Sequence, residues 1–115
     1  MKLEGEGKLV RVFVGESDRW HGKPLYQAIV ERMREAGLAG ATVMRGIEGF
    51  GATSRLHTTR ILQLSTDLPV VIEIVDTDER IDGILPILDE MVGDGLVTLE
   101  KVHIITYRGS PRDEA

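Results

Sequence analysis

Four segments of the chain carry the apolar patterns typical of β-strands, namely residues 9–15, 41–48, 70–75 and 97–107. The strongest signal is VVIEIV at residues 70–75, a short run rich in β-branched side chains. In a strand, successive side chains point to opposite faces of the sheet. Val10, Val12 and Val14 therefore share one face, and Leu9, Arg11 and Phe13 share the other.

Apolar residues at helical spacing predict a first helix from about Pro24 to Ala36. A proline is well suited to the first turn of a helix, where its missing N–H costs nothing. Gly37 follows the last apolar position and supplies a left-handed stop. The sequence thus predicts a helix between the first two strands.

A second helix is predicted between the last two strands. Asp76 with Glu79 three residues later resembles a capping box. An apolar stripe at helical spacing follows, and the run Gly93-Asp94-Gly95 ends it. The stripe consists of Ile81, Ile84, Leu85, Leu88, Met91 and Val92. Pro86 lies inside this stripe and removes one helical hydrogen bond, so we expect a kink there.

The predicted order is β-α-β-β-α-β, the ferredoxin-like arrangement of the α+β class. It gives a four-stranded antiparallel sheet with both helices on one face. The chain has 115 residues, which favours a single domain over residues 1–115.

The face that the helices leave open is expected to be mixed. By alternation, it would carry the apolar residues Val71, Val75, Leu99 and Ile105 and the polar residues Glu73, Lys101 and His103. One interpretation is a surface with scattered apolar residues, which is common. The other, which we favour, is an oligomer interface with an ion pair from Glu73 to Lys101 or His103, because an exposed sheet face is usually more polar.

Composition excludes several classes of function. A formal net charge of -5 disfavours a nucleic-acid binder, and the absence of cysteine excludes disulfides and thiolate metal sites. The first residues carry several charges, and no apolar run approaches the roughly 20 residues of a membrane helix. We therefore expect a cytoplasmic protein that neither crosses a membrane nor binds nucleic acid.

A long segment without clear period, residues 49–69, separates the second and third strands. It is entered through Arg45-Gly46-Ile47-Glu48-Gly49-Phe50-Gly51, in which three glycines allow backbone N–H groups to approach an anion. Further basic residues follow within the segment, at Arg55, His57 and Arg60. Anion capture is one interpretation, and a glycine-rich hairpin with solvated basic residues is the other.

Two long stretches resemble the DUF190 family of PII-like signalling proteins. They are RGIEGFGATSRLHTTRILQLSTDLPVVIEIVD at residues 45–76 and ILPILDEMVGDGLVTLEKVHIITY at residues 84–107. The resemblance implies a ferredoxin-like fold and a homotrimer. By analogy with PII proteins, it implies an adenine nucleotide bound in a cleft between subunits and a long loop that moves on signalling.

The resemblance also implies site residues. Gly93-Asp94-Gly95 is similar to the start of the Gly-Asp-Gly-Lys turn with which PII proteins cradle phosphates, but Leu96 replaces the lysine. Arg108 follows the last strand, roughly where PII proteins carry basic phosphate contacts. The expected ligand-binding residues are Arg45, Gly46, Gly49, Phe50, Gly51, Gly93, Gly95 and Arg108.

We therefore expect a regulatory protein that binds an adenine nucleotide or a similar anionic effector and docks on a partner through residues 49–68. One alternative is a structural or divalent-metal-binding trimer like the CutA proteins. The other is a small nucleotide hydrolase. The histidines lack metal-ligand spacing, and no base or nucleophile is supported by spacing, so we expect no metal, no resident cofactor and no enzymatic activity.

Overall fold

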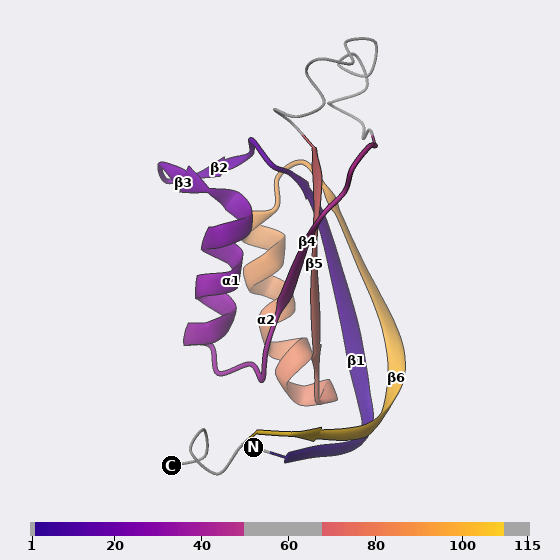
Figure 1. The fold of residues 1–115 in the computed structure, drawn as a ribbon. Coiled ribbons are helices and arrows are strands. Elements are labelled where there is room, and N and C mark those ends of the chain that lie inside the picture. Colours follow the sequence, from indigo (N-terminus) through magenta and orange to yellow (C-terminus); the bar gives the residue numbers. More distant parts are fainter. Residues whose placement is uncertain (1, 50–67, 110–115) are drawn as a thin grey trace.

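An antiparallel sheet of four strands, in the order β4-β5-β1-β6, forms the centre of the computed structural model (Figure 1). These strands are β1 (Lys2–Gly15), β4 (Thr42–Arg45), β5 (Pro69–Asp76) and β6 (Leu96–Arg108). The structure describes residues 2–49 and 68–109. The predicted ferredoxin-like α+β fold is confirmed, with the first strand in the interior of the sheet.

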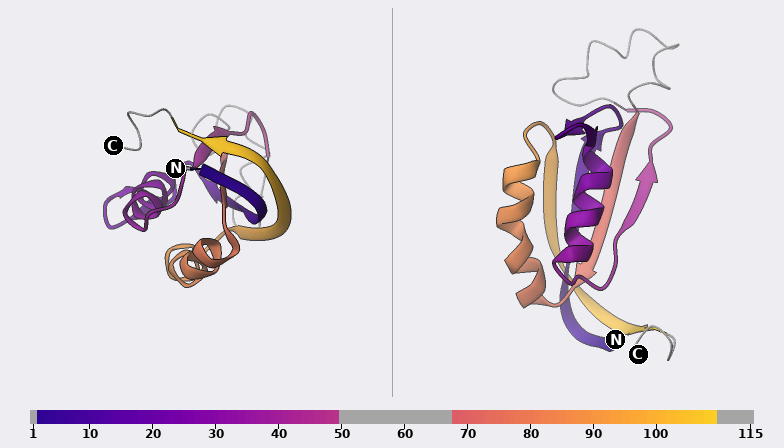
Figure 2. Two further views of the ribbon diagram at one scale, coloured as in Figure 1. Left: turned by 90° about the horizontal axis from the view of Figure 1, so that it is seen from below. Right: turned by 90° about the vertical axis from the view of Figure 1, so that its left-hand side faces the viewer.

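Both helices, α1 (Leu25–Glu35) and α2 (Asp78–Met91), cover the same face of the sheet (Figure 2). α1 begins one residue later than predicted, because Pro24 has an extended backbone and precedes the helix as its N-cap. Pro24 also ends a short hairpin that the sequence analysis missed, in which β2 (Arg19–Trp20) pairs with β3 (Lys23–Pro24).

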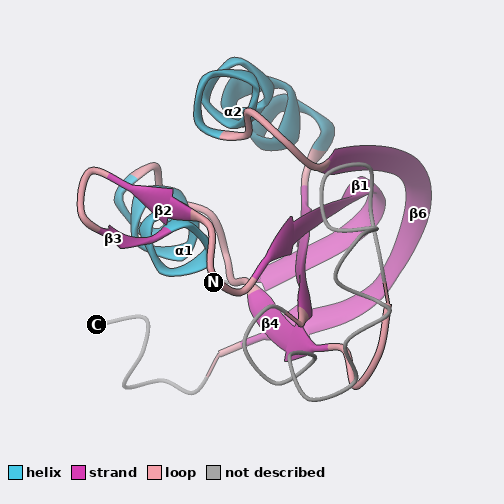
Figure 3. Cartoon of the chain, turned by 90° about the horizontal axis from the view of Figure 1, so that it is seen from above, coloured by secondary structure: helices cyan, strands magenta, loops and turns pink. Residues whose placement is uncertain are grey.

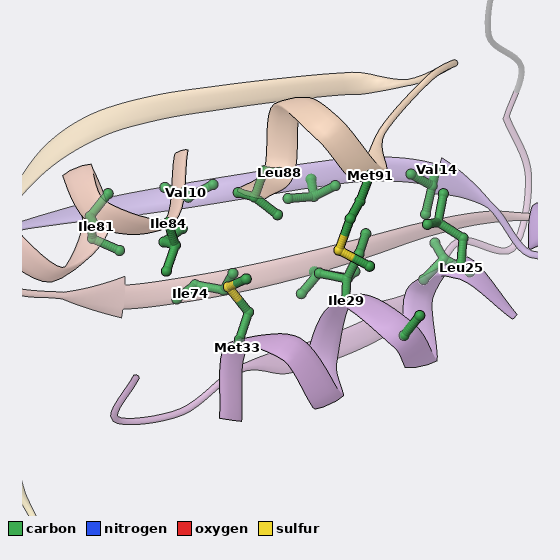
Figure 4. Packing of buried hydrophobic residues seen from close by; sticks show 14 residues of the cluster. Val10, Val14, Leu25, Ile29, Met33, Ile74, Ile81, Ile84, Leu88 and Met91 are labelled. Atoms are coloured by element: carbon green, nitrogen blue, oxygen red, sulfur yellow. The ribbon is translucent and has the colours of Figure 1, made fainter. Parts of the chain in front are cut away.

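The main hydrophobic core lies between the sheet and the helices (Figure 4). Full burial of one Val, Leu or Ile side chain contributes about 1.5–3 kcal/mol, so this layer holds both helices on the sheet. Its strand positions are the ones that alternation predicts. The cluster consists of Val10, Val12, Val14, Val70, Ile72 and Ile74 from the strands and Leu25, Ala28, Ile29, Met33, Ile81, Ile84, Leu88 and Met91 from the helices.

The start of α2 differs from the predicted capping box. Thr77 is the N-cap, and its side-chain oxygen accepts a hydrogen bond from the Arg80 backbone N–H at 3.3 Å. Asp76 is fully buried instead, and its carboxylate accepts from the backbone N–H groups of Thr77 at 2.7 Å and Ala39 at 2.8 Å. α2 continues through Pro86 to Met91.

The first strand is longer than predicted, because β1 begins at Lys2, which pairs with Arg108. Beyond Asp76, where β5 ends, β1 and β6 continue as a two-stranded ribbon that bends at the lower end of Figure 1. Gly7 allows the close packing there, since a Cβ at this position would lie 2.6 Å from the Asp76 carbonyl oxygen. The polar, glycine-containing sequence of this segment carries no clear strand signal.

The register of β6 reverses the predicted faces of this strand. Residues directly opposite each other on antiparallel strands share a face. Leu99 lies opposite the buried Val10, and Lys101 lies opposite Lys8, whose Nζ contacts Asp82 of α2 at 2.7 Å. Leu99, Lys101 and His103 are therefore on the helix side of the sheet, not on the open face.

On the open face, Arg11 of β1 forms ion pairs with a carboxylate on each neighbouring strand, β5 and β6. Its Nε lies 2.8 Å from Oε2 of Glu73, and its Nη1 lies 2.7 Å from Oε1 of Glu100. The hydrogen bonds of Glu73 and then of Glu100 raise the pKa of Arg11 above its ordinary value. The predicted pairing of Glu73 with Lys101 or His103 is thus wrong within one chain, because β1 lies between β5, which carries Glu73, and β6.

Candidate functional site

The base of the long segment is closed by contacts between its two sides. The Gly46 N–H donates to the Pro69 carbonyl oxygen at 2.7 Å. A Cβ at Gly46 would lie 2.7 Å from Pro69 Cγ, and one at Gly49 would lie 3.0 Å from the same atom. Real Cβ atoms essentially never approach within 3.0 Å. At least Gly46 is therefore required for the two sides to meet, whatever ligand the region binds.

Arg45, the last residue of β4, carries positive charge at this base. One of its guanidinium nitrogens contacts Oε2 of Glu16, which directly follows β1. The Arg45 side chain is 61% exposed, whereas that of Glu16 is only 21% exposed. Arg45 is therefore held from one side by an internal carboxylate while much of its side chain faces outward.

The Gly93-Asp94-Gly95 turn between α2 and β6 contains two different glycines. A Cβ at Gly95 would lie 2.6 Å from the Phe13 carbonyl oxygen and 3.0 Å from Val92 Cγ1, so packing alone requires glycine there. A Cβ at Gly93 would meet nothing within 4 Å. Gly93 is exposed and leaves its backbone accessible, which is the property a phosphate-binding turn needs.

The loop base and this turn lie at the same end of the sheet but on its opposite edges, as the view from above shows (Figure 3). Arg45 of β4 pairs with Val70 of β5, which in turn pairs with Val14 of β1. Phe13, the residue before Val14, pairs with Leu96 at the start of β6. Three strand spacings of about 4.8 Å put roughly 14 Å between the two edges. The two groups of predicted residues therefore do not meet within one chain.

Arg108 is not brought together with either group. It pairs with Lys2 at the far end of the β1–β6 ribbon, a whole strand length from the Gly93–Gly95 turn (Figure 1). Arg108 and this turn therefore cannot form one wall of a site within a single chain. Phe50, Gly51 and the interior of the predicted docking segment, residues 50–67, lie outside the described residues.

Glu16 was not among the site residues predicted from the sequence. Its partner Arg45 is 29 residues away in the chain, and no local pattern connects a carboxylate after one strand with an arginine ending another. Only the topology, which places β5 between β1 and β4, brings the ends of these strands to the same end of the sheet.

Within residues 2–49 and 68–109, no group of three or more His, Asp or Glu side chains could hold a metal ion. No helix in these ranges is both long and apolar enough to cross a membrane. A separate hollow of about 360 Å³ lies beside Trp20, Lys23 and Glu31, on the helix layer and away from the predicted site. Its walls carry charges of both signs, and Lys23 Nζ contacts Glu31 at 2.8 Å.

Comparison of the sequence with known families gives one clear assignment. Residues 7–104 match the model of DUF190, described as "Uncharacterized ACR, COG1993". A UPF0166 protein of Aquifex aeolicus (strain VF5) is 44% identical over 100 residues, covering 85% of this chain and 92% of that protein. A UPF0166 protein of Methanocaldococcus jannaschii is 34% identical over 105 residues, covering 90% and 94%.

Solved structures with the same fold include two of the PII type. A crystal structure from Thermus thermophilus, whose protein is described as PII-like and signalling, gives a TM-score of 0.62 at 19% identity and covers 88% of this chain and 91% of that one. The GlnK–ATP complex of B. subtilis gives a TM-score of 0.55 at 12% identity, covering 87% and 84%. The chain therefore belongs to the DUF190 family and has a PII-like, ferredoxin-like fold.

Proposed function

We propose that the protein is a PII-like regulator that binds an adenine nucleotide, or a similar anionic effector, between the subunits of a homotrimer. It would act in the cytoplasm, dock on a protein partner through residues 49–68 and catalyse no reaction. The PII-like fold supports this proposal, and the neighbouring GlnK structure contains ATP.

One observation carries the proposal: the loop base and the Gly93–Gly95 turn lie at the same end of the sheet but on its opposite edges. Arg45 and Gly46 lie at the β4 edge, and the Gly93–Gly95 turn lies at the β6 edge. A single chain offers an anion only one of them. In a ring of copies, the β4 edge of one subunit would face the β6 edge of the next. The positive charge of Arg45 would then lie near the accessible backbone of Gly93 from the neighbouring subunit, and the ligand would bind between the two subunits.

The open face of the sheet offers a surface for such an assembly. The ion pairs of Arg11 lie among partly exposed apolar side chains, including Met44 at 43%, Val75 at 39% and Leu96 at 54%. Exposed apolar side chains gathered on one face of the sheet are consistent with an interaction surface. Replacing Glu73 with Lys would place two cations side by side there, so the variant should assemble more weakly.

Light scattering on the wild type and on Glu73→Lys at micromolar concentration tests the assembly. We expect a trimer for the wild type and a shift toward smaller species for the variant. Reversal of the exposed Glu79 to Lys, on the first turn of α2, is the matched control and should leave the mass unchanged. A monomeric wild type would contradict the proposal.

Calorimetry with AMP, ADP and ATP tests the ligand. Arg45→Ala should weaken binding about fivefold or more, because a charge-assisted hydrogen bond to phosphate is lost. Gly93→Val should also weaken it, since the added side chain covers exposed backbone, and a Cβ there meets no neighbour in the chain. Leu96 in place of a lysine leaves one cation fewer for a triphosphate, so we expect micromolar rather than nanomolar affinity.

The other functions predict different outcomes in the same experiment. Binding of divalent metal without any response to nucleotide would favour a CutA-like trimer. Release of phosphate or nucleoside from a nucleotide panel would favour a hydrolase. Absence of nucleotide binding, or wild-type affinity in both Arg45→Ala and Gly93→Val, would overturn the site.

A further inference from the structure

Glu16 is an unusual carboxylate, because its two oxygens have different surroundings. Oε2 contacts the guanidinium of Arg45. Oε1 is buried and has no hydrogen-bond partner among the described residues. A buried polar atom without a partner is costly, and native structures contain few of them. The folded chain therefore keeps a partly unsatisfied anion next to the cation of its candidate ligand site.

Backbone hydrogen bonds fix the position of Glu16 relative to the two ends of the 50–67 segment. The Glu16 N–H donates to the Leu68 carbonyl oxygen at 2.8 Å, and the Gly46 N–H donates to the carbonyl of the next residue, Pro69, at 2.7 Å. These two bonds join the end of β1, the end of β4 and the start of β5. Glu16 and Arg45 therefore meet at the point where both ends of the 50–67 segment connect to the sheet.

This geometry has a direct electrostatic consequence for an anionic ligand. While Glu16 neutralises Arg45, the loop base presents little net positive charge. A phosphate that engages Arg45 either displaces the Glu16 carboxylate or shares the guanidinium with it, and in both cases it approaches a second negative charge. Like charges at close range disfavour each other, and more strongly where water is partly excluded.

We infer that Glu16 is an internal competitor for the ligand, a carboxylate that holds Arg45 when the site is empty and releases it to a phosphate group. This inference rests on the proposed function, because it assigns the regulation of the same site. Ligand binding would break the Glu16–Arg45 contact at the base of the 50–67 segment. The exchange would thereby connect occupancy of the site to the segment that we propose for docking.

The test is calorimetry with ATP and with pyrophosphate on the wild type, Glu16→Gln, Arg45→Ala and the double variant. Glu16→Gln keeps the shape of the side chain and removes its charge. We expect binding about two- to fivefold tighter than in the wild type, which is the scale of a partly exposed ion pair. Glu16→Ala, which also removes the unpartnered oxygen, should give the same direction if the glutamine variant does not fold.

Glu31→Gln is the matched control. It removes the carboxylate of the Lys23–Glu31 pair on the helix layer, changes the net charge by the same amount and should leave binding unchanged. In the Arg45→Ala background, Glu16→Gln should no longer tighten binding, because the contested cation is absent. Equal tightening in both backgrounds would mean general charge repulsion and would overturn the inference.

The outcomes separate this inference from the proposed function. If ATP binds the wild type but Glu16→Gln binds it equally or more weakly, the competitor role is wrong and the nucleotide site stands. If ATP binds neither protein but pyrophosphate binds Glu16→Gln more tightly than wild type, the competitor role stands and the nucleotide assignment fails. If neither ligand binds any variant, both are wrong.

Discussion

The phenol of Tyr107 donates a hydrogen bond to the carbonyl oxygen of Ala39 at 2.8 Å. Tyr107 belongs to the far part of β6, whereas Ala39 lies in the connection between α1 and β4. The N–H of the same Ala39 donates to the buried Asp76 carboxylate. This residue is thus held on both sides just before the edge strand β4 begins.

Tyr107→Phe removes the bond from β6 and should lower the free energy of unfolding by about 0.5–1 kcal/mol, the net value of a partly exposed hydrogen bond. Urea denaturation measures this change. Amide exchange of β4 should become faster as well. Tyr26→Phe is the control, because the Tyr26 phenol has no hydrogen-bond partner within the described part of the chain. A larger effect at Tyr26 would contradict the anchoring role of Tyr107.

Asp76→Asn should be more harmful, with a loss of about 2–3 kcal/mol. The carboxylate accepts two backbone N–H bonds inside the protein, and an amide offers one acceptor oxygen while its NH₂ group faces the second donor. The same urea experiment tests this. The exposed neighbour Asp78, in the first turn of α2, is the control, and Asp78→Asn should cost well under about 1 kcal/mol. Equal losses at the two positions would argue against the buried network.

The two glycines of the 93–95 turn should respond differently to alanine. Gly95→Ala forces a Cβ against the Phe13 carbonyl oxygen and should destabilise the fold by about 1–3 kcal/mol. Gly93→Ala meets open space and should change the unfolding free energy by less than about 0.5 kcal/mol. Thermal denaturation of the pair checks this. A stable Gly95→Ala would mean that strand β6 can move away from β1 at this end.

The Lys23–Glu31 pair makes a prediction about pH. The hydrogen bond from Lys23, followed by that from Gln27, lowers the pKa of Glu31 below its ordinary value of 4.5. A lowered pKa means that the contribution to stability is fully present above pH 4.5 and is lost as the pH falls through the folded-state pKa. NMR titration of the Glu31 carboxyl should give a higher pKa in Lys23→Met than in wild type.

At alkaline pH, the stability contributed by the Lys23–Glu31 pair changes with pH in the opposite direction. The hydrogen bond to Glu31 raises the pKa of Lys23 above 10.5, so its contribution is complete below that pH and is lost as the pH rises through the raised value. An unchanged Glu31 pKa in the Lys23→Met protein would show that the contact does not persist in solution.

The helix-facing core could be predicted because burial imposes a strict pattern. Val70, Ile72 and Ile74 alternate with partly exposed residues over a full strand, so a period of two was sufficient to identify their face. The assignment of side chains to the two faces of the sheet failed for β6, where burial imposes no such pattern. β6 is an edge strand whose residues are mostly exposed, so its apolar positions do not report which side faces the helices. The register with β1, a long-range property, decides the faces instead.

The candidate site was only partly visible in the sequence for a similar reason. Gly46, Gly49 and the 93–95 turn stood out as local glycine patterns, and the structure gives Gly46, Gly49 and Gly95 a steric reason. The Glu16–Arg45 contact and the separation of Arg108 from the turn depend on which strands lie beside one another. One-dimensional spacing carries no information about such relationships.

The central position of β1 has a consequence for how the chain folds. Both of its neighbours in the sheet come much later in the sequence: Lys8 pairs with Asp76, and Lys2 pairs with Arg108. These long stretches of chain lose conformational entropy before the strands pair and gain stabilising contacts. The protein should therefore fold more slowly than one with mostly local contacts. On the ribosome, the sheet can be completed only after Arg108 has emerged. Until then, β1 presents one unpaired edge, which leaves the partly folded chain prone to aggregation.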